Sequence, residues 1–167
     1  MLLSFKVVCG NYKNAMDASI AIESIHTASL IYDDLFDDST TRRNKQPMHK
    51  KYGLNISILC SNILISYSII CISKYNHNII YYFGKSGINL CLGEIIDIKQ
   101  NKDDDINNYI NCIKKKTASL FELCTYIGSC IGNGTKREIN SMKRFGMYFG
   151  ISYQLIDDLF ARRYKFY

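Results

Sequence analysis

Two polar clusters rich in aspartate stand far apart in the chain, each inside an apolar, helix-like stretch. The first consists of Asp33, Asp34, Asp37 and Asp38, and the second of Gln154, Asp157 and Asp158. A helix brings residues three and four apart onto one face, so Asp33 and Asp37 point the same way. Carboxylates this close repel each other unless a cation neutralises them, and hard oxygen ligands suit Mg²⁺. Two such clusters facing each other would form a cage for Mg²⁺ and a phosphorylated substrate.

The elements that position these clusters are predicted to be helices. Apolar residues recur at helical intervals over residues 14–38, and the second cluster lies on a last helix that starts near Lys136. Between them we expect helices over residues 54–73 and 79–102, and another that begins at residues 103–105, because acidic residues favour a helix N-terminus. No strand-like alternation is sustained, so the fold class is predicted to be all-α.

Composition predicts one globular domain over residues 1–167. The chain is 47% hydrophobic and 22% charged, and its one proline, Pro47, leaves little to interrupt long helices. The net charge of +6 suits an anionic small ligand, although charge alone favours a solvated surface bias. No dense lysine and arginine stripe indicates a nucleic-acid surface.

The seven cysteines indicate a reducing compartment. They form no CxxC pair and have apolar neighbours, which predicts buried, reduced thiols. The N-terminus has neither the long apolar core of a secretory signal nor an evident transit peptide. We therefore expect a cytoplasmic location, or the stroma or matrix of an organelle.

Residues 54–73 carry no charge and are long enough to span a bilayer. Serine and asparagine interrupt the segment regularly, however, and a helix that is apolar nearly all round also occurs at the centre of a helical bundle. We favour a buried helix and expect no integral membrane span.

Residues 22–49 contain an ordered pattern: Asp33-Asp34-x-x-Asp37, four further positions, and then the pair Arg42-Arg43. This segment resembles the all-trans polyprenyl diphosphate synthases, whose DDxxD motif is followed by an arginine pair and Gly-x-Pro. Asn44 stands where the family has the glycine. Further family elements follow in the family's order, namely Gly93-Glu94-x-x-Asp97, Lys116-Thr117 and Tyr153-Gln154-x-x-Asp157-Asp158.

The resemblance implies an antiparallel helical bundle of the isoprenoid synthase type and a Mg²⁺-dependent transferase. Such an enzyme condenses isopentenyl diphosphate with an allylic prenyl diphosphate, and it usually forms a dimer. By resemblance the metal ligands are Asp33, Asp34, Asp37, Asp157 and Asp158.

The same resemblance assigns roles to other side chains. Arg42 would bind the allylic diphosphate and Arg43 the isopentenyl diphosphate, since guanidinium groups bind phosphate in two-pronged fashion. Lys116 and Thr117 would contact the allylic diphosphate and its leaving oxygen. Two further residues are implied: Gln154 near the reacting carbon and His26 at the isopentenyl diphosphate. His26 is as readily explained as an ordinary core histidine.

Ala28 and Ser29 precede Asp33 by about one helical turn, where the growing hydrocarbon would pass. In the resembling family, bulky aromatic residues at these positions end chain elongation early and give short products. Both residues are small here, which predicts products of geranylgeranyl length or longer. Ordinary helix packing by small residues is the alternative interpretation.

Three departures from the family pattern predict a chain truncated at both ends. The family's N-terminal Gly-Gly-Lys-x-x-Arg segment is absent, Ser61-Asn62 replace a Gly-Asp pair, and Ala161 stands where the second cluster should have its last aspartate. Two other functions stay open: a non-catalytic subunit that dimerises with a complete synthase, and a cyclising terpene synthase. The elements around Arg42, Glu94 and Lys116 favour chain elongation over cyclisation.

Overall fold

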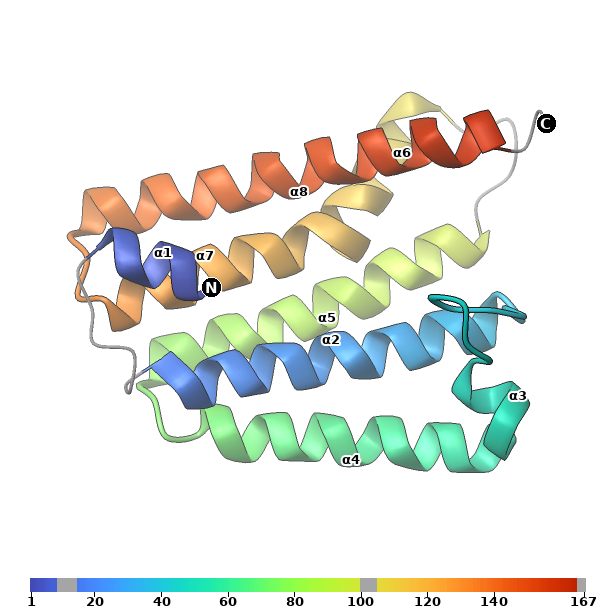
Figure 1. Ribbon diagram of the computed structural model, residues 1–167. Coiled ribbons are helices and arrows are strands. Elements are labelled where there is room, and N and C mark those ends of the chain that lie inside the picture. Colours follow the sequence, from blue (N-terminus) through green and yellow to red (C-terminus); the bar gives the residue numbers. More distant parts are fainter. Residues whose placement is uncertain (9–14, 100–104, 165–167) are drawn as a thin grey trace. The chain divides into compact units, whose positions relative to one another are not determined.

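The computed structural model describes residues 1–8, 15–99 and 105–164, with side chains up to residue 160 (Figure 1). These residues form helices without a β-strand, so the predicted all-α class is confirmed. The helices are α1 (Leu2–Val7), α2 (Met16–Phe36), α3 (Met48–Tyr52), α4 (Leu54–Ile72), α5 (His77–Lys99), α6 (Ile106–Ile113), a π-helical turn (Lys114–Ala118), α7 (Ser119–Ile131) and α8 (Lys136–Tyr164).

The predicted helices are confirmed apart from their ends. Residues 14 and 100–104, where three predicted boundaries fall, lie outside the described residues. The helix expected to run on from residue 105 is divided by the π-helical turn into α6 and α7. The sequence pattern missed α1 and α3, because five or six residues are too few to show a helical period.

The chain divides into two compact units. One comprises Met16–Ile80, and the other comprises Met1–Ala15 together with Tyr81–Tyr167, so the boundary falls inside α5. The first aspartate cluster belongs to the first unit and the second cluster to the other. The prediction that residues 1–167 form one domain, and that the clusters face each other, stays a prediction.

In the unit Met16–Ile80, α4 packs along α2 (Figure 1), and several serines of α4 are buried. Ser57, Ser61 and Ser68 are completely buried. Each hydroxyl donates to a backbone carbonyl of the preceding turn, at Gly53 (3.0 Å), Ser57 (3.0 Å) and Ile65 (2.7 Å). The helices can approach closely because the side chains are small, and no buried hydroxyl is left unpaired at these three positions.

The opposite face of α4 is apolar and exposed. Leu59, Ile63 and Ile70 are 57%, 65% and 61% exposed. The prediction of a buried helix is therefore wrong for this face, because the serines rather than the large apolar side chains point inward. Among the described residues, α4 is the one helix whose length and composition would let it cross a membrane, and no other observation supports a span.

In the other unit, α7 packs along α8, and α1 packs on α7 (Figure 1). Phe121 of α7 contacts the rings of Phe149 and Tyr153 of α8, with centroids 5.3 and 5.5 Å away. At Gly150 a β-carbon would lie 2.6 Å from the Cα of Ala118. A side chain at Gly150 would therefore push α8 away from the π-helical turn.

No disulfide joins cysteines in the described part of the chain, and the reduced state stays a prediction. Cys71 and Cys112 are buried as expected, but Cys91 is exposed on α5. Cys9 lies outside the described residues.

Candidate functional site

The first aspartate cluster lies at the C-terminal end of α2. The helix ends at Phe36, and the backbone N–H groups of Asp37 and Ser39 still donate to the carbonyls of Asp33 (3.0 Å) and Asp34 (2.9 Å). Asp37 is exposed, and Asp33 is partly exposed one turn earlier. The two carboxylates that the sequence places on one face are therefore both reachable from solvent.

Arg42 bridges the first two aspartates. Its Nε donates to Asp34 Oδ1 at 2.6 Å, and its Nη2 donates to Asp33 Oδ2 at 2.8 Å. Asp34 is buried, with 5% of its surface exposed. Partial burial alone would lower the pKa of Arg42, but its hydrogen bond to Asp34 and the charges of both aspartates outweigh that effect and raise the pKa.

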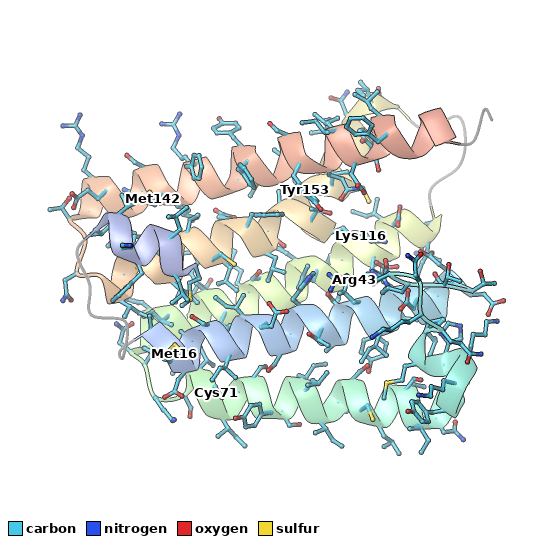
Figure 2. The ribbon with its side chains drawn as sticks, in the orientation of Figure 1. Met16, Arg43, Cys71, Lys116, Met142 and Tyr153 are labelled. Carbon is cyan, nitrogen blue, oxygen red and sulfur yellow. The ribbon has the colours of Figure 1, made fainter. Side chains whose placement is uncertain are left out.

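A tight turn brings Arg42 back to the end of α2. The backbone N–H and C=O groups of Arg42 and Lys45 pair at 2.8 and 3.0 Å, and the two residues between them have positive φ, 51° at Arg43 and 61° at Asn44. Asparagine tolerates this left-handed conformation better than most side chains. Asn44 therefore suits the place where the resembling family has glycine, and Arg43 is exposed in the same turn (Figure 2).

Asp38 has different partners from Asp33 and Asp34. It accepts a hydrogen bond from Lys50 of α3, and His49 Nε2 lies 3.6 Å from its carboxylate. The hydrogen bond from Lys50 lowers the pKa of Asp38, and the charges of Lys50 and His49 add to that effect. Asp38 thus joins the end of α2 to α3, a role that the sequence did not reveal.

The residues one to two turns before Asp33 are held within α2. Ser29 Oγ donates to the carbonyl of His26 at 2.8 Å, and Ala28 is buried. Tyr32, which sequence analysis did not single out, donates from its hydroxyl to Asn62 Oδ1 of α4 at 2.9 Å. Asn62 occupies the position of the family's aspartate, and here its amide fixes the Tyr32 ring.

The second cluster forms a chain of hydrogen bonds. Thr117 Oγ1 donates to Gln154 Oε1 at 2.8 Å, and Gln154 Nε2 donates to Asp158 Oδ1 at 2.9 Å. Tyr109 of α6 donates to the other oxygen of Asp158 at 2.5 Å. Both oxygens of Asp158 are therefore engaged, whereas Asp157 is exposed on α8. Tyr109 was missed, because nothing in its sequence context distinguishes it from a packing tyrosine.

Lys116 lies in the π-helical turn and reaches the carboxylates of α5 (Figure 2). Its Nζ is 2.9 Å from Glu94 Oε2 and 2.5 Å from Asp97 Oδ2. The π-helical turn widens the backbone by one residue, a distortion that is frequent at functional sites. Lys116 and Thr117 consequently have different partners: Lys116 pairs with α5, and Thr117 pairs with α8.

Gly93 explains why α5 can approach the turn so closely. A β-carbon at Gly93 would lie 2.3 Å from the backbone nitrogen of Lys116 and 2.6 Å from its Cα. No real β-carbon comes so near, so only glycine fits there without a shift of the backbone. The Gly93-Glu94-x-x-Asp97 element thus places two carboxylates beside Lys116.

The chain matches the model of a known protein family. The model of the polyprenyl synthetase family matches residues 1–162. The chain belongs to the polyprenyl synthetase family.

Relatives of known name agree with this membership. Over 160 residues the chain is 38% identical to geranylfarnesyl diphosphate synthase of Methanosarcina mazei, covering 95% of this chain and 54% of that protein. It is 31% identical over 147 residues to heptaprenyl diphosphate synthase component 2 of Bacillus subtilis, covering 84% and 41%. The chain spans about half the length of the curated relatives it matches.

A solved structure shows the same fold. Geranylgeranyl pyrophosphate synthetase from Pyrococcus horikoshii superposes with a TM-score of 0.89 at 29% identity, covering 94% of this chain and 50% of that one. The antiparallel all-α fold expected from the resemblance is therefore confirmed for this member of the polyprenyl synthetase family.

The acidic residues of this polyprenyl synthetase chain have the donor chemistry that Mg²⁺ prefers. Arg42 already places a positive group against Asp33 and Asp34, so this position accommodates a cation. Within the described residues, no three histidine, cysteine, aspartate or glutamate side chains converge as a ready metal site. A metal held by the first cluster would lie beside Arg42, which already contacts Asp33 and Asp34.

Cys112 lies beside Gly93 and Asp97, and its thiol is uncharged at neutral pH. Its thiol lies 3.5 Å from the carbonyl oxygen of Gly93 and 3.9 Å from Asp97. Burial, with a smaller effect of the Asp97 charge, raises the pKa of Cys112 to about 11. The thiol is thus protonated at neutral pH, in keeping with a buried packing cysteine.

Proposed function

We propose that this chain supplies catalytic helices of a Mg²⁺-dependent trans-prenyltransferase. The enzyme would condense isopentenyl diphosphate with an allylic prenyl diphosphate to give a polyprenyl diphosphate. The observation that carries the proposal is the hydrogen-bonded set Thr117–Gln154–Asp158 beside Lys116, all positions that the family resemblance implicates. Membership of a family whose relatives are named as prenyl diphosphate synthases supports the same chemistry.

The cationic side chains would bind and stabilise the diphosphates. Arg42 and Lys116 serve the allylic diphosphate, and Arg43 serves the isopentenyl diphosphate. Their fixed positive charges stabilise the negative charge that develops on the departing diphosphate when the allylic carbon ionises. Magnesium, when bound, supplies further charge neutralisation of that leaving group.

The aspartates would divide into ligands and supports. Asp33, Asp37 and Asp157, which are at least partly exposed, are the proposed Mg²⁺ ligands. Asp34 is buried against Arg42, and both oxygens of Asp158 accept hydrogen bonds, so these two would orient their neighbours more than they bind the metal directly.

Gln154 and Thr117 would lie near the reacting carbon, and His26 would contact the isopentenyl diphosphate. The hydrogen bond from Thr117 orients the Gln154 carbonyl, since the amide nitrogen is directed to Asp158. The released diphosphate is the proposed acceptor of the proton lost in the last step. No side-chain base is then needed.

Product length is proposed to be geranylgeranyl or longer. Ala28 is buried and the Ser29 hydroxyl is bonded to its own helix, so neither projects a bulky group. The similarity to a protein named geranylfarnesyl diphosphate synthase agrees with a long product. Replacing Ser29 with phenylalanine should shorten the product, as read by chromatography of the dephosphorylated alcohols.

A second candidate function is that of a partner subunit in a prenyl synthase dimer. The exposed apolar face of α4 favours association, and the similarity to a protein named component 2 of a heptaprenyl diphosphate synthase is in keeping with a two-part enzyme. A cytoplasmic or organellar location is proposed for either function.

The test is an assay with labelled isopentenyl diphosphate, geranyl or farnesyl diphosphate, and Mg²⁺. Incorporation by the chain alone, lost in Asp33→Asn and Lys116→Ala, supports the enzyme. Incorporation only after mixing with a complete synthase, together with co-purification, supports the partner subunit. A folded chain that gives no incorporation and captures no synthase would refute both.

A further inference from the structure

Lys116 is the one predicted diphosphate-binding cation of its unit, and its ammonium is already paired with two carboxylates. Glu94 and Asp97 lie three residues apart on α5 and contact the same Nζ at 2.9 and 2.5 Å. The side chains of Lys116, Glu94 and Asp97 are 25%, 16% and 39% exposed. Lys116 and Glu94 are partly shielded from water, so their pair interacts more strongly than a surface pair does, whereas water screens the more exposed Asp97.

We propose that Glu94 and Asp97 are return partners of Lys116, that is, positioning residues that hold the ammonium when diphosphate is absent and take it back when inorganic diphosphate leaves. This inference rests on the proposed function, in which Lys116 binds the allylic diphosphate. It adds a role for two carboxylates that do not themselves touch the substrate.

Charge is the first support for this exchange. One ammonium and two carboxylates carry a net charge of −1, so the site attracts an anion only after Lys116 leaves its partners. Diphosphate must then replace the contacts that Lys116 makes with Glu94 and Asp97. The free energy gained on binding is the difference between the new contacts and the old ones, and it is smaller than the free energy of the new contacts alone. An anion held by such a difference dissociates faster than one held by an unpaired lysine.

The backbone is the second support. Gly93 packs directly against the backbone of Lys116, which places α5 next to the π-helical turn. In the proposed exchange, Glu94 and Asp97 therefore remain close to the ammonium when diphosphate is bound. Without them, product release would leave a partly buried cation unpaired, which is unfavourable.

The experiment compares isosteric variants of the two carboxylates. Glu94→Gln and Asp97→Asn, singly and together, keep an oxygen that can accept a hydrogen bond from Lys116 but remove the competing charge. The matched control is Glu122→Gln, which removes the same charge from a similarly exposed pair in the same unit, Lys143–Glu122 at 3.5 Å. Calorimetry of the full chain with inorganic diphosphate, with and without Mg²⁺, gives the dissociation constants.

The expected result is tighter binding of inorganic diphosphate. The dissociation constant should fall about fivefold or more in the double variant, within the usual range of coupling between sites, and its dissociation rate should fall in parallel. The control should stay within about twofold, since its pair lies elsewhere. Circular dichroism shows which variants are folded, and either folded single variant suffices for the comparison.

Two outcomes overturn the inference in different ways. Unchanged or weaker binding in the folded variants, with normal binding by the wild type, refutes the return partners and leaves the proposed function standing. A folded wild-type chain that binds no inorganic diphosphate at any Mg²⁺ concentration refutes the proposed function, and the inference falls with it.

Discussion

At the scale of single residues, Arg42 connects the first aspartate cluster to the loop that follows it. Its guanidinium satisfies the buried Asp34 and also contacts Asp33. The sequence predicts Arg42 only as a ligand for diphosphate. The structure adds an internal role, because the same two-pronged geometry that suits a phosphate also suits two neighbouring carboxylates.

Replacing Arg42 with glutamine should destabilise the fold. The change leaves the buried carboxylate of Asp34 without its charged partner, and such losses cost about 1–3 kcal/mol. Urea denaturation, followed by circular dichroism, measures the change in unfolding free energy. Arg43→Gln is the control, since it removes the same charge from an exposed side chain in the same turn. Equal losses in the two variants would contradict this account.

Cys112 predicts a dependence of stability on alkaline pH. Its pKa rises from the ordinary 9.0 to about 11 in the folded protein. Above pH 9.0 the unfolded thiol ionises while the folded one stays protonated, so the free energy of unfolding falls as the pH rises and levels off near pH 11.

The measurement is the difference in unfolding free energy between wild type and Cys112→Ala at several pH values from about 7 to 10, a range that spans the ordinary thiol pKa. The difference should be constant below the ordinary pKa and should shrink above it, because only the wild type loses stability through this thiol. A difference that does not vary with pH would show that Cys112 ionises as easily in the folded chain as in the unfolded one.

At the scale of elements, the contact between α5 and the π-helical turn depends on Gly93. Gly93→Ala should destabilise the protein by about 1–3 kcal/mol, the usual cost of overpacking, and should displace Lys116 from Asp97. Gly84→Ala on the same helix is a matched control, because a β-carbon there meets nothing within 4 Å. That substitution should stabilise α5 by up to about 1 kcal/mol.

Thermal and urea unfolding of both variants measure these effects. If the two alanines behaved alike, the close approach at Gly93 would have no energetic consequence.

The sequence predicted the long elements well and the short or irregular ones poorly. Helices α2, α5 and α8 are long enough for apolar residues to repeat several times, and α4 is recognisable as a long uncharged apolar segment. The π-helical turn carries no such signal. Of the three lysines in a row, 114–116, the family resemblance singles out Lys116, but its pairing with Glu94 and Asp97 depends on the backbone geometry.

The candidate site could be predicted where the type and spacing of the residues indicate their chemistry. Asp33 and Arg42 were identified from their spacing, and the structure brings them together. Tyr109 and Glu94 gained partners that depend on folding, since they join residues far apart in the chain. No sequence pattern specifies that Asp158 accepts from Tyr109, because the two side chains meet only once α6 lies against α8.

At the scale of the whole molecule, the exposed apolar face of α4, which includes Leu59, Ile63 and Ile70, is the surface most suited to association. Large apolar side chains are exposed along it while serines occupy its buried face. Exposed apolar surface of this extent indicates association with another protein surface. In the proposed function, that surface belongs to a second prenyl synthase subunit.

Ile63→Lys and Ile70→Lys should therefore weaken self-association or association with a complete synthase. Each places a charge in the centre of the proposed interface, while both positions are exposed and should tolerate lysine in the monomer. Sedimentation velocity over a range of concentrations measures the effect. Lys85→Glu on α5, also at an exposed position, is the control. If Ile63→Lys left the sedimentation unchanged, the proposed interface would be wrong.

The π-helical turn also has a consequence for how this chain is aligned and engineered. A π-helical turn holds one residue more than the α-helix it interrupts. Deleting Lys115 should let the backbone revert to a regular α-helix, and everything after the deletion would rotate by about 100° relative to α6. Tyr109 of α6 would then lose Asp158 of α8 without any change in its own side chain. One surplus residue therefore sets the angular relation between α6 and the helices that follow it, and an alignment that treats it as a gap would assign the roles of Lys116 and Thr117 to the wrong positions.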